Sequence, residues 1–178
     1  MNANKKIVIT GGPGTGKTSV VDFLKSQGHY CMSEISRQVT LEARAQGIEQ
    51  LFLTDPLLFS KKLLEGRIEQ YKLVPDTEKT IFFDRGIPDV LAYMDYTKDP
   101  YPDYFEEACL EYRYDQVFLL PPWKEIYTSD NERYESFSQA QRIYKFLKSA
   151  YQRYNYQLTE VPTGTVDYRA RFILNNIQ

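Results

Sequence analysis

Short apolar runs alternate with longer segments of mixed polarity along this chain of 178 residues. The apolar runs predict buried strands over residues 5–10, 30–32, 80–84, 116–120 and 156–161. Apolar positions at helical spacing predict helices over residues 17–27, 33–46, 55–71, 136–154 and 166–177. Two shorter helices, each opened by Pro-Asp, are expected after the third strand. This alternation indicates an α/β domain with a mostly parallel sheet and helices on both faces.

Helix starts are marked by residues that can accept hydrogen bonds from a first turn. Ser33, Asp55 and Ser136 are the predicted N-caps. Pro56 supports the second start, and Gln139 completes a capping box with Ser136. No repeat or low-complexity linker interrupts the pattern, so a single domain over residues 1–178 is expected.

A glycine-rich turn joins the first strand to the first helix. Gly11 and Gly16-Lys17-Thr18 match the spacing of the phosphate-binding P-loop. Glycines let successive backbone N–H groups surround a phosphate, and the helix dipole adds to their effect. Lys17 can reach the β- and γ-phosphates, and the Thr18 hydroxyl can hold Mg²⁺. A dinucleotide site is excluded because Lys17 stands where its third glycine is required. The turn therefore predicts ATP with Mg²⁺.

The third predicted strand ends in a carboxylate, at the edge of the sheet where α/β proteins bind ligands. Asp84 is followed by Arg85, whereas ATPase machines usually carry a glutamate there to polarise water. The sequence also contains no N/T-K-x-D motif for guanine. Asp84-Arg85-Gly86 resembles the Asp-Arg pair of small P-loop kinases, where these residues meet Mg²⁺ and the acceptor. The alternative is an ion pair at the strand end.

Glu34 and Arg37 follow the second predicted strand. Their spacing would place both on one face of a helix. Glu34 is a candidate base or anchor for an acceptor hydroxyl, because phosphoryl transfer requires an oriented nucleophile and charge neutralisation. The alternative is a surface ion pair of small energetic effect.

The polar stretch at residues 122–136 has no helical periodicity and lies where P-loop kinases carry a lid. Arg133 or Lys124 could close over the phosphates and stabilise the transferred charge. Arg142 is a weaker candidate, and a solvated loop is the alternative. Glu160–Gly164 follows the last strand, where small kinases often contact adenine.

Composition and charge exclude several classes of protein. The net charge of −2 argues against a protein that binds nucleic acid through many phosphate contacts. No stretch approaches a transmembrane helix or a signal peptide, so a cytoplasmic protein is expected. One histidine and two cysteines leave no ligand set for structural zinc. The many tyrosines are interpreted as packing residues of helices rather than as a stacking surface.

Five segments together resemble a known family. They are VITGGPGTGKTSV, SEISRQV, FFDRGIPDVLAY, VFLLPPWKEIYTSDNERYESF and TEVP. They are similar to the AAA-labelled family of small P-loop ATPase- and kinase-like proteins, which is related to the nicotinamide-riboside kinase domain of NAD-regulator proteins and to thymidylate and deoxynucleoside kinases. The resemblance implies a kinase-type P-loop NTPase fold with three layers and strand order 2-3-1-4-5. It implies acceptor contacts from Glu34, Arg37, Asp84 and Arg85, Arg133 in the lid, and ATP contacts from Gly12, Pro13, Gly14, Thr15, Gly16, Lys17, Thr18 and Ser19.

The sequence thus favours an ATP- and Mg²⁺-dependent kinase acting on a small molecule, with a hydroxyl or phosphate acceptor. Lys17, Glu34, Asp84, Arg85 and Arg133 are the predicted catalytic residues, and Thr18 and Asp84 are the predicted metal ligands. An ATP-hydrolysing switch for a protein partner and a non-catalytic nucleotide sensor remain as alternatives. A homo-oligomer also remains open.

Overall fold

The computed structural model describes residues 4–127 and 135–178. Within these residues five parallel strands form one sheet in the order β2-β3-β1-β4-β5, which confirms the expected fold. The strands are β1 (Lys5–Gly11), β2 (Tyr30–Met32), β3 (Thr80–Asp84), β4 (Gln116–Leu120) and β5 (Leu158–Glu160). The helices are α1 (Lys17–Ser26), α2 (Ile35–Ala45), α3 (Leu51–Thr54), α4 (Pro56–Lys72), α5 (Ile87–Thr97), α6 (Tyr104–Glu111), α7 (Phe137–Arg153) and α8 (Val166–Asn175).

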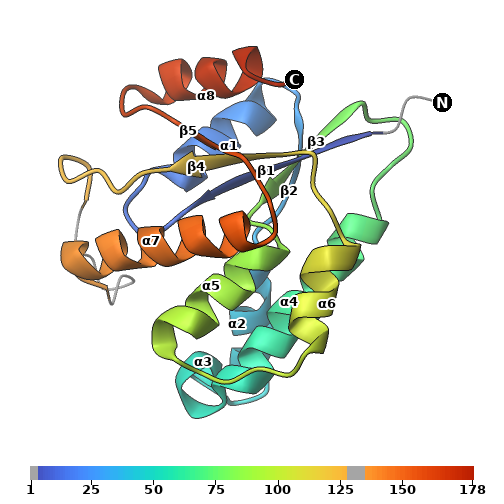
Figure 1. Ribbon diagram of the computed structural model, residues 1–178, viewed down its shortest axis with the longest axis vertical. Helices are drawn as coiled ribbons and strands as arrows, with labels where there is room; N and C mark the ends of the chain where they lie inside the picture. The colour runs from blue at the N-terminus through green and yellow to red at the C-terminus, as the bar shows by residue number, and fades with distance from the viewer. Residues whose placement is uncertain (1–3, 128–134) are drawn as a thin grey trace.

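Helices cover both faces of the sheet, as the alternating pattern predicts (Figure 1). Ile7 and Ile9 of β1 pack with α1 and α8 on one face, in an apolar cluster of fully buried side chains. Val8 points to the other face and packs in the cluster that includes α2, α4, α5 and α6. Successive strand residues alternate between faces, so a strand that is buried on both sides is apolar throughout.

The order of the strands places a crevice beside β1. β1 pairs with β3 on one side and with β4 on the other, and Ile9 is in register with Asp84. After β1 the chain passes through α1 to β2, which lies on the same side of β1 as β3. After β3 the chain crosses to β4, on the other side of β1. In open α/β sheets, ligands bind at the carboxyl ends of the strands where the direction of winding changes. The P-loop and Asp84 both lie at this edge.

Two details of the helices differ from the sequence analysis. The prediction of Ser33 as an N-cap is wrong, because the chain is still extended at Glu34 (φ −68°, ψ 121°) and α2 begins at Ile35. The Ser33 carbonyl oxygen instead accepts a hydrogen bond from the Gln70 side chain at 2.7 Å. The short helix α3 was not predicted. The cap at Asp55 and the capping box of Ser136 and Gln139 are confirmed.

Candidate active site

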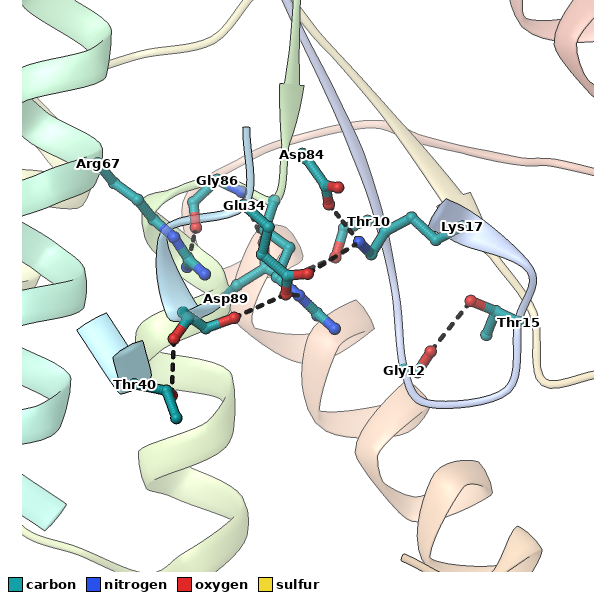
Figure 2. Close-up of polar contacts among 12 residues, drawn as sticks. Thr10, Gly12, Thr15, Lys17, Glu34, Thr40, Arg67, Asp84, Gly86 and Asp89 are labelled. Carbon is teal, nitrogen blue, oxygen red and sulfur yellow. Dashed lines mark hydrogen bonds and ion pairs between the residues drawn. The ribbon is translucent and has the colours of Figure 1, made fainter. Parts of the chain in front are cut away.

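The loop between β1 and α1 is shaped to surround a phosphate group. Gly14 and Gly16 have left-handed backbone conformations, with φ of 70° and 75°, which other residues rarely adopt. Thr15 Oγ1 donates a hydrogen bond to the Gly12 carbonyl oxygen at 3.0 Å and closes the loop on itself (Figure 2). The N-cap of α1 is Gly16, which has no side chain to cap the first turn. Backbone N–H groups at the positive end of the helix dipole can therefore serve an anion.

Lys17 connects this loop to two carboxylates from other strands. Its side chain is 5% exposed, forms an ion pair with Asp84, and lies 3.8 Å from Glu34 Oε2 (Figure 2). Asp84 is the last residue of β3, and Glu34 comes directly before α2. A buried ammonium requires such partners, since desolvation of an unpaired charge costs several kcal/mol. The same ammonium has the length and charge to reach a bound phosphate.

Glu34 also forms an ion pair with Arg85. Arg85 Nε donates to Glu34 Oε1 at 2.9 Å, and Ser36 Oγ donates to the same oxygen at 2.9 Å. Burial alone would raise the pKa of the Glu34 carboxyl, but the charges of Arg85 and Lys17 outweigh it and hold the pKa well below its usual range. Glu34 is therefore a carboxylate throughout the physiological range of pH.

Arg85 is held in a strained backbone conformation. Its φ of 73° is left-handed, which costs a non-glycine residue about 1–2 kcal/mol. The Arg85 N–H donates to the Ile9 carbonyl oxygen at 3.1 Å, and its guanidinium lies 5.5 Å from the centre of the Tyr93 ring. Strain of this kind persists only where the surrounding contacts impose it. The contacts here aim the guanidinium at Glu34.

Asp89 is the centre of a buried network that supports Arg85. This carboxylate is fully buried and accepts hydrogen bonds from Thr10 Oγ1 at 2.5 Å, Tyr151 Oη at 2.5 Å and the Gly86 N–H at 2.9 Å. It also lies 3.3 Å from Arg85 Nη1. Burial and the charge of Asp89 raise the pKa of the Tyr151 hydroxyl well above its usual value, so Tyr151 stays a donor. The network thus joins β1, α5 and α7 behind Arg85.

Asp89, Thr10 and Tyr151 were not predicted from the sequence to belong to the site. Asp89 was interpreted only as part of a Pro-Asp helix start. That signal was correct but incomplete, because the Asp89 carboxylate does accept a hydrogen bond from the N–H of Gly86, the N-cap residue of α5, at 2.9 Å. Arg67 was missed as well. It is 3% exposed and donates from Nη1 to the Gly86 carbonyl oxygen at 2.6 Å (Figure 2).

Some of the predicted site residues line a common cavity, and others do not. A cavity of about 140 Å³ is lined by Arg85, Glu34 and the loop from Gly12 to Thr18, which includes Pro13, Gly14, Thr15, Gly16 and Lys17. Ser19 and Arg37 are exposed and do not line this cavity. Among the described residues Glu34 pairs with Lys17 and Arg85, and not with Arg37 as the surface-pair alternative required.

The beginning of the expected lid contacts the P-loop. A Cβ atom on Gly14 would lie 2.3 Å from the Tyr127 ring, and one on Gly16 would lie 3.1 Å from Ile126 Cδ1. Arg133 lies outside the described residues. Lys124 is exposed, and the Arg142 guanidinium lies 5.6 Å from the centre of the Tyr96 ring.

The arrangement of the P-loop, Lys17, Glu34 and Asp84 can be compared with known proteins. A sequence model of a family described as "AAA domain" matches residues 6–169. The chain belongs to this AAA-domain family. A search of curated protein sequences gives no match.

Solved structures of kinases share the fold of this AAA-domain chain. The deoxyadenosine kinase of M. mycoides with dCMP and dCDP has a TM-score of 0.70 at 18% identity, over 96% of this chain and 97% of that one. The thymidylate kinase of Candida albicans has a TM-score of 0.65 at 16% identity, over 97% and 90%. NadR protein in complex with NR has a TM-score of 0.72 at 16% identity, over 97% of this chain and 48% of NadR. At these identities the similarity establishes the P-loop kinase-like fold.

The AAA-domain chain offers hard oxygen donors for Mg²⁺. Thr18 lines the cavity, and the Asp84 carboxylate lies beside it through its contact with Lys17. No cluster of three or more acidic, histidine or cysteine side chains that could hold a metal occurs in residues 4–127 and 135–178. Mg²⁺ usually takes one or two carboxylates together with substrate phosphates and water. Thr18 and Asp84 fit that mode of binding.

Residues outside the site have structural roles. His29 packs edge-on against Phe82 before the amino end of β2, at the opposite edge of the sheet from the P-loop. Burial raises the pKa of the Cys31 and Cys109 thiols to about 12, so neither is a reactive thiolate. Tyr114, Tyr154 and Tyr156 are buried in the core, although they lie outside the helices on which the tyrosines were expected to pack. None of the described helices is long and apolar enough to cross a membrane.

Proposed function

We propose that the protein is an ATP- and Mg²⁺-dependent kinase that transfers the γ-phosphate of ATP to a hydroxyl group of a small molecule. The observation that carries this proposal is the position of Glu34. Its carboxylate lines the same cavity as the P-loop and lies 3.8 Å from Lys17 Nζ. An anionic acceptor of hydrogen bonds thus stands beside the residue expected to hold the γ-phosphate.

In the proposed reaction, backbone N–H groups of Gly12–Thr18 and the Lys17 ammonium hold the phosphates. The Pγ–O bond to the β-phosphate breaks as the acceptor oxygen bonds to Pγ, and ADP leaves. Glu34 accepts a hydrogen bond from the acceptor hydroxyl and orients it. Its low pKa suits orientation more than early proton removal, because the loose transition state of phosphoryl transfer needs little deprotonation of the nucleophile. The hydroxyl proton is released late, through Glu34 to solvent.

Thr18 and Asp84 would hold Mg²⁺ together with the nucleotide phosphates, and the ion would supply neutralisation of their charge. Lys17 and Asp84 pair with each other in the structure, so on binding Lys17 would exchange this partner for a phosphate and Asp84 would exchange it for Mg²⁺. Arg85 neutralises Glu34 and lines the cavity, where it can stabilise charge on the transferred phosphoryl group.

A hydroxyl acceptor is favoured over a phosphate acceptor by the charges on this side of the cavity. Arg85 is the cavity-lining cation there, and it already faces the two carboxylates of Glu34 and Asp89. A phosphate acceptor would add negative charge beside these two carboxylates, and buried Arg67, which contacts the Gly86 carbonyl oxygen, does not line the cavity. A neutral hydroxyl adds none.

The test is incubation with ATP, Mg²⁺ and a pooled set of nucleosides, nucleotides and other hydroxylated metabolites. ADP formation and new phosphorylated masses are measured together. Transfer to a hydroxyl should occur in the wild type and fall at least a hundredfold in Glu34→Gln, with ATP affinity within about threefold. Glu42→Gln, an exposed change in α2, the helix that directly follows Glu34, is the control and should keep full activity. ADP without a phosphorylated product would favour a hydrolysing switch, and binding without turnover would favour a nucleotide sensor.

A further inference from the structure

A second buried arginine lies behind the P-loop and is not explained by the acceptor site. Arg169 of α8 is 1% exposed, although its guanidinium is charged at any physiological pH. Nη1 donates to the Thr15 carbonyl oxygen at 2.7 Å, and Nε donates to the Pro162 carbonyl oxygen at 3.2 Å. One side chain therefore joins the P-loop to the segment that follows β5.

The guanidinium also meets the beginning of the expected lid. Its central carbon lies 5.8 Å from the centre of the ring of Trp123, the one tryptophan of the chain. Nη1 would lie 2.9 Å from a Cβ atom on Gly16. Arg169 thus packs directly against the glycine where the P-loop turns into α1.

The charge of Arg169 has no carboxylate partner in the part of the chain that the structure describes. No carboxylate of residues 4–127 or 135–178 forms an ion pair with it, and Nη2 is buried without a hydrogen-bond partner among these residues. Burial lowers the pKa of Arg169. A buried cation without an anion destabilises a fold. Unsatisfied buried groups of this kind concentrate at functional sites.

The two cations that line the cavity show the contrast, whereas buried Arg67 also lacks an ion pair among the described residues but contacts the Gly86 carbonyl oxygen rather than the P-loop. Lys17 faces Asp84 and Glu34, and Arg85 faces Glu34 and Asp89. Arg169 instead faces the outer side of a loop whose inner side is shaped for phosphate. The negative charge that would balance it is that of a ligand bound in the loop.

We propose that Arg169 is a positioning residue for the polyphosphate: it fixes the P-loop through Thr15 and supplies a positive charge that bound phosphates neutralise. This proposal rests on the nucleotide binding in the proposed function, but it does not depend on any acceptor. It predicts that the effect of Arg169 grows with the charge of the ligand. It also predicts that the effect does not require an adenine ring.

The experiment measures dissociation constants for ATP, ADP and inorganic tripolyphosphate by calorimetry, with melting temperatures for each variant. Arg169→Gln removes the charge and keeps a donor at the position of Nε, which contacts Pro162, but loses the donor to Thr15. It should weaken ATP and tripolyphosphate at least tenfold and ADP by less. Arg169→Lys keeps the charge and should bind tripolyphosphate within about threefold of the wild type. Arg171→Gln is the matched control on the same helix, because Arg171 is 72% exposed and pairs with Asp167, and its affinities should be unchanged.

Equal tripolyphosphate affinity in Arg169→Gln and wild type would overturn the proposal. An equal loss in the Gln and Lys variants would overturn it too, since the charge would then be irrelevant. A loss for ATP alone would assign Arg169 to the base or ribose instead. If the wild type binds none of the three ligands, the proposed function fails together with this inference. If it binds them and the variants do not differ, only this inference fails.

Discussion

The two ends of the candidate site carry positive charge in different ways. On the side of Glu34, Arg85 is enclosed by two carboxylates, and one of them, Asp89, is fully buried. Behind the P-loop, Arg169 has no carboxylate partner among residues 4–127 and 135–178. The first arrangement is internally neutralised and suits an uncharged group. The second is balanced only when an anion binds, which suits a polyphosphate. Lys17 lies between the two and pairs with Asp84 and Glu34.

Removal of Lys17 should produce the largest effect, because this residue connects the two ends. Lys17→Ala should weaken ATP at least a hundredfold, or abolish detectable binding, since the γ-phosphate loses its nearest cation. The measurement is the ATP dissociation constant. Lys25→Ala, an exposed change in the last turn of α1, is the control and should leave the affinity unchanged. Unchanged ATP affinity and activity in Lys17→Ala would rule out the P-loop as the nucleotide site.

A substitution at Gly16 tests the arrangement of the P-loop and Arg169. In Gly16→Ala, a left-handed backbone costs about 1–2 kcal/mol, and the new Cβ would lie 2.9 Å from Arg169 Nη1. We expect at least a tenfold loss of ATP affinity together with a lower melting temperature.

Gly28→Ala separates the effect of backbone strain from the effect of the contact with Arg169. Gly28 also has a left-handed φ, of 86°, but nothing lies within 4 Å of its Cβ position. It should show the loss of stability from backbone strain without the loss of ATP affinity. Equal ATP affinities in the two variants would show that the contact between Gly16 and Arg169 has no role in binding.

The side of Glu34 is tested by removing one hydroxyl from the network around Asp89. Tyr151→Phe deletes a donor to a buried carboxylate, which should lower the free energy of unfolding by about 1–3 kcal/mol. Because Asp89 holds Arg85, turnover should also fall several-fold, while ATP affinity stays within about twofold. Calorimetric melting and steady-state kinetics measure the two effects.

Tyr154→Phe is the matched control for that change. The Tyr154 hydroxyl is buried beside Cys109 and Arg153, outside the network around Asp89, so its removal should leave turnover unchanged. If both variants lose turnover equally, the network around Asp89 does not position Arg85.

These comparisons also separate what the sequence could predict from what it could not. Strands and most helix caps follow from local patterns, and the P-loop follows from the spacing of Gly11, Gly16 and Lys17. The network around Asp89 does not, because its partners Thr10 and Tyr151 are 79 and 62 residues away in the sequence. Only the folded sheet and α7 bring them together. Glu34 was identified by its place after β2, but its true partner, Arg85, is 51 residues away.

Arg169 shows a different limit of sequence reasoning. An arginine in a helix of mixed polarity predicts a solvated surface, as Arg171 in the same helix confirms with its 72% exposure. Burial of Arg169 depends on the position of α8 against α1 and the P-loop (Figure 1), which local pattern does not encode. The missing carboxylate partner is visible only when the surrounding residues are assembled.

The smallest expected effect is a dependence of stability on pH that belongs to Glu34. Its pKa is lower in the folded protein than the value of about 4.3 in an unfolded chain. The resulting stabilisation is therefore complete above that value and is lost as the pH falls below it. The melting temperature of the wild type relative to Glu34→Gln should be constant from pH 8 to about 5. It should then decrease by a few degrees toward pH 3.

A difference in melting temperature that instead grows as the pH falls would mean that burial, and not Arg85 and Lys17, dominates the environment of Glu34. The internally neutralised arrangement on that side would then be wrong, whereas the evidence for Arg169 would stand.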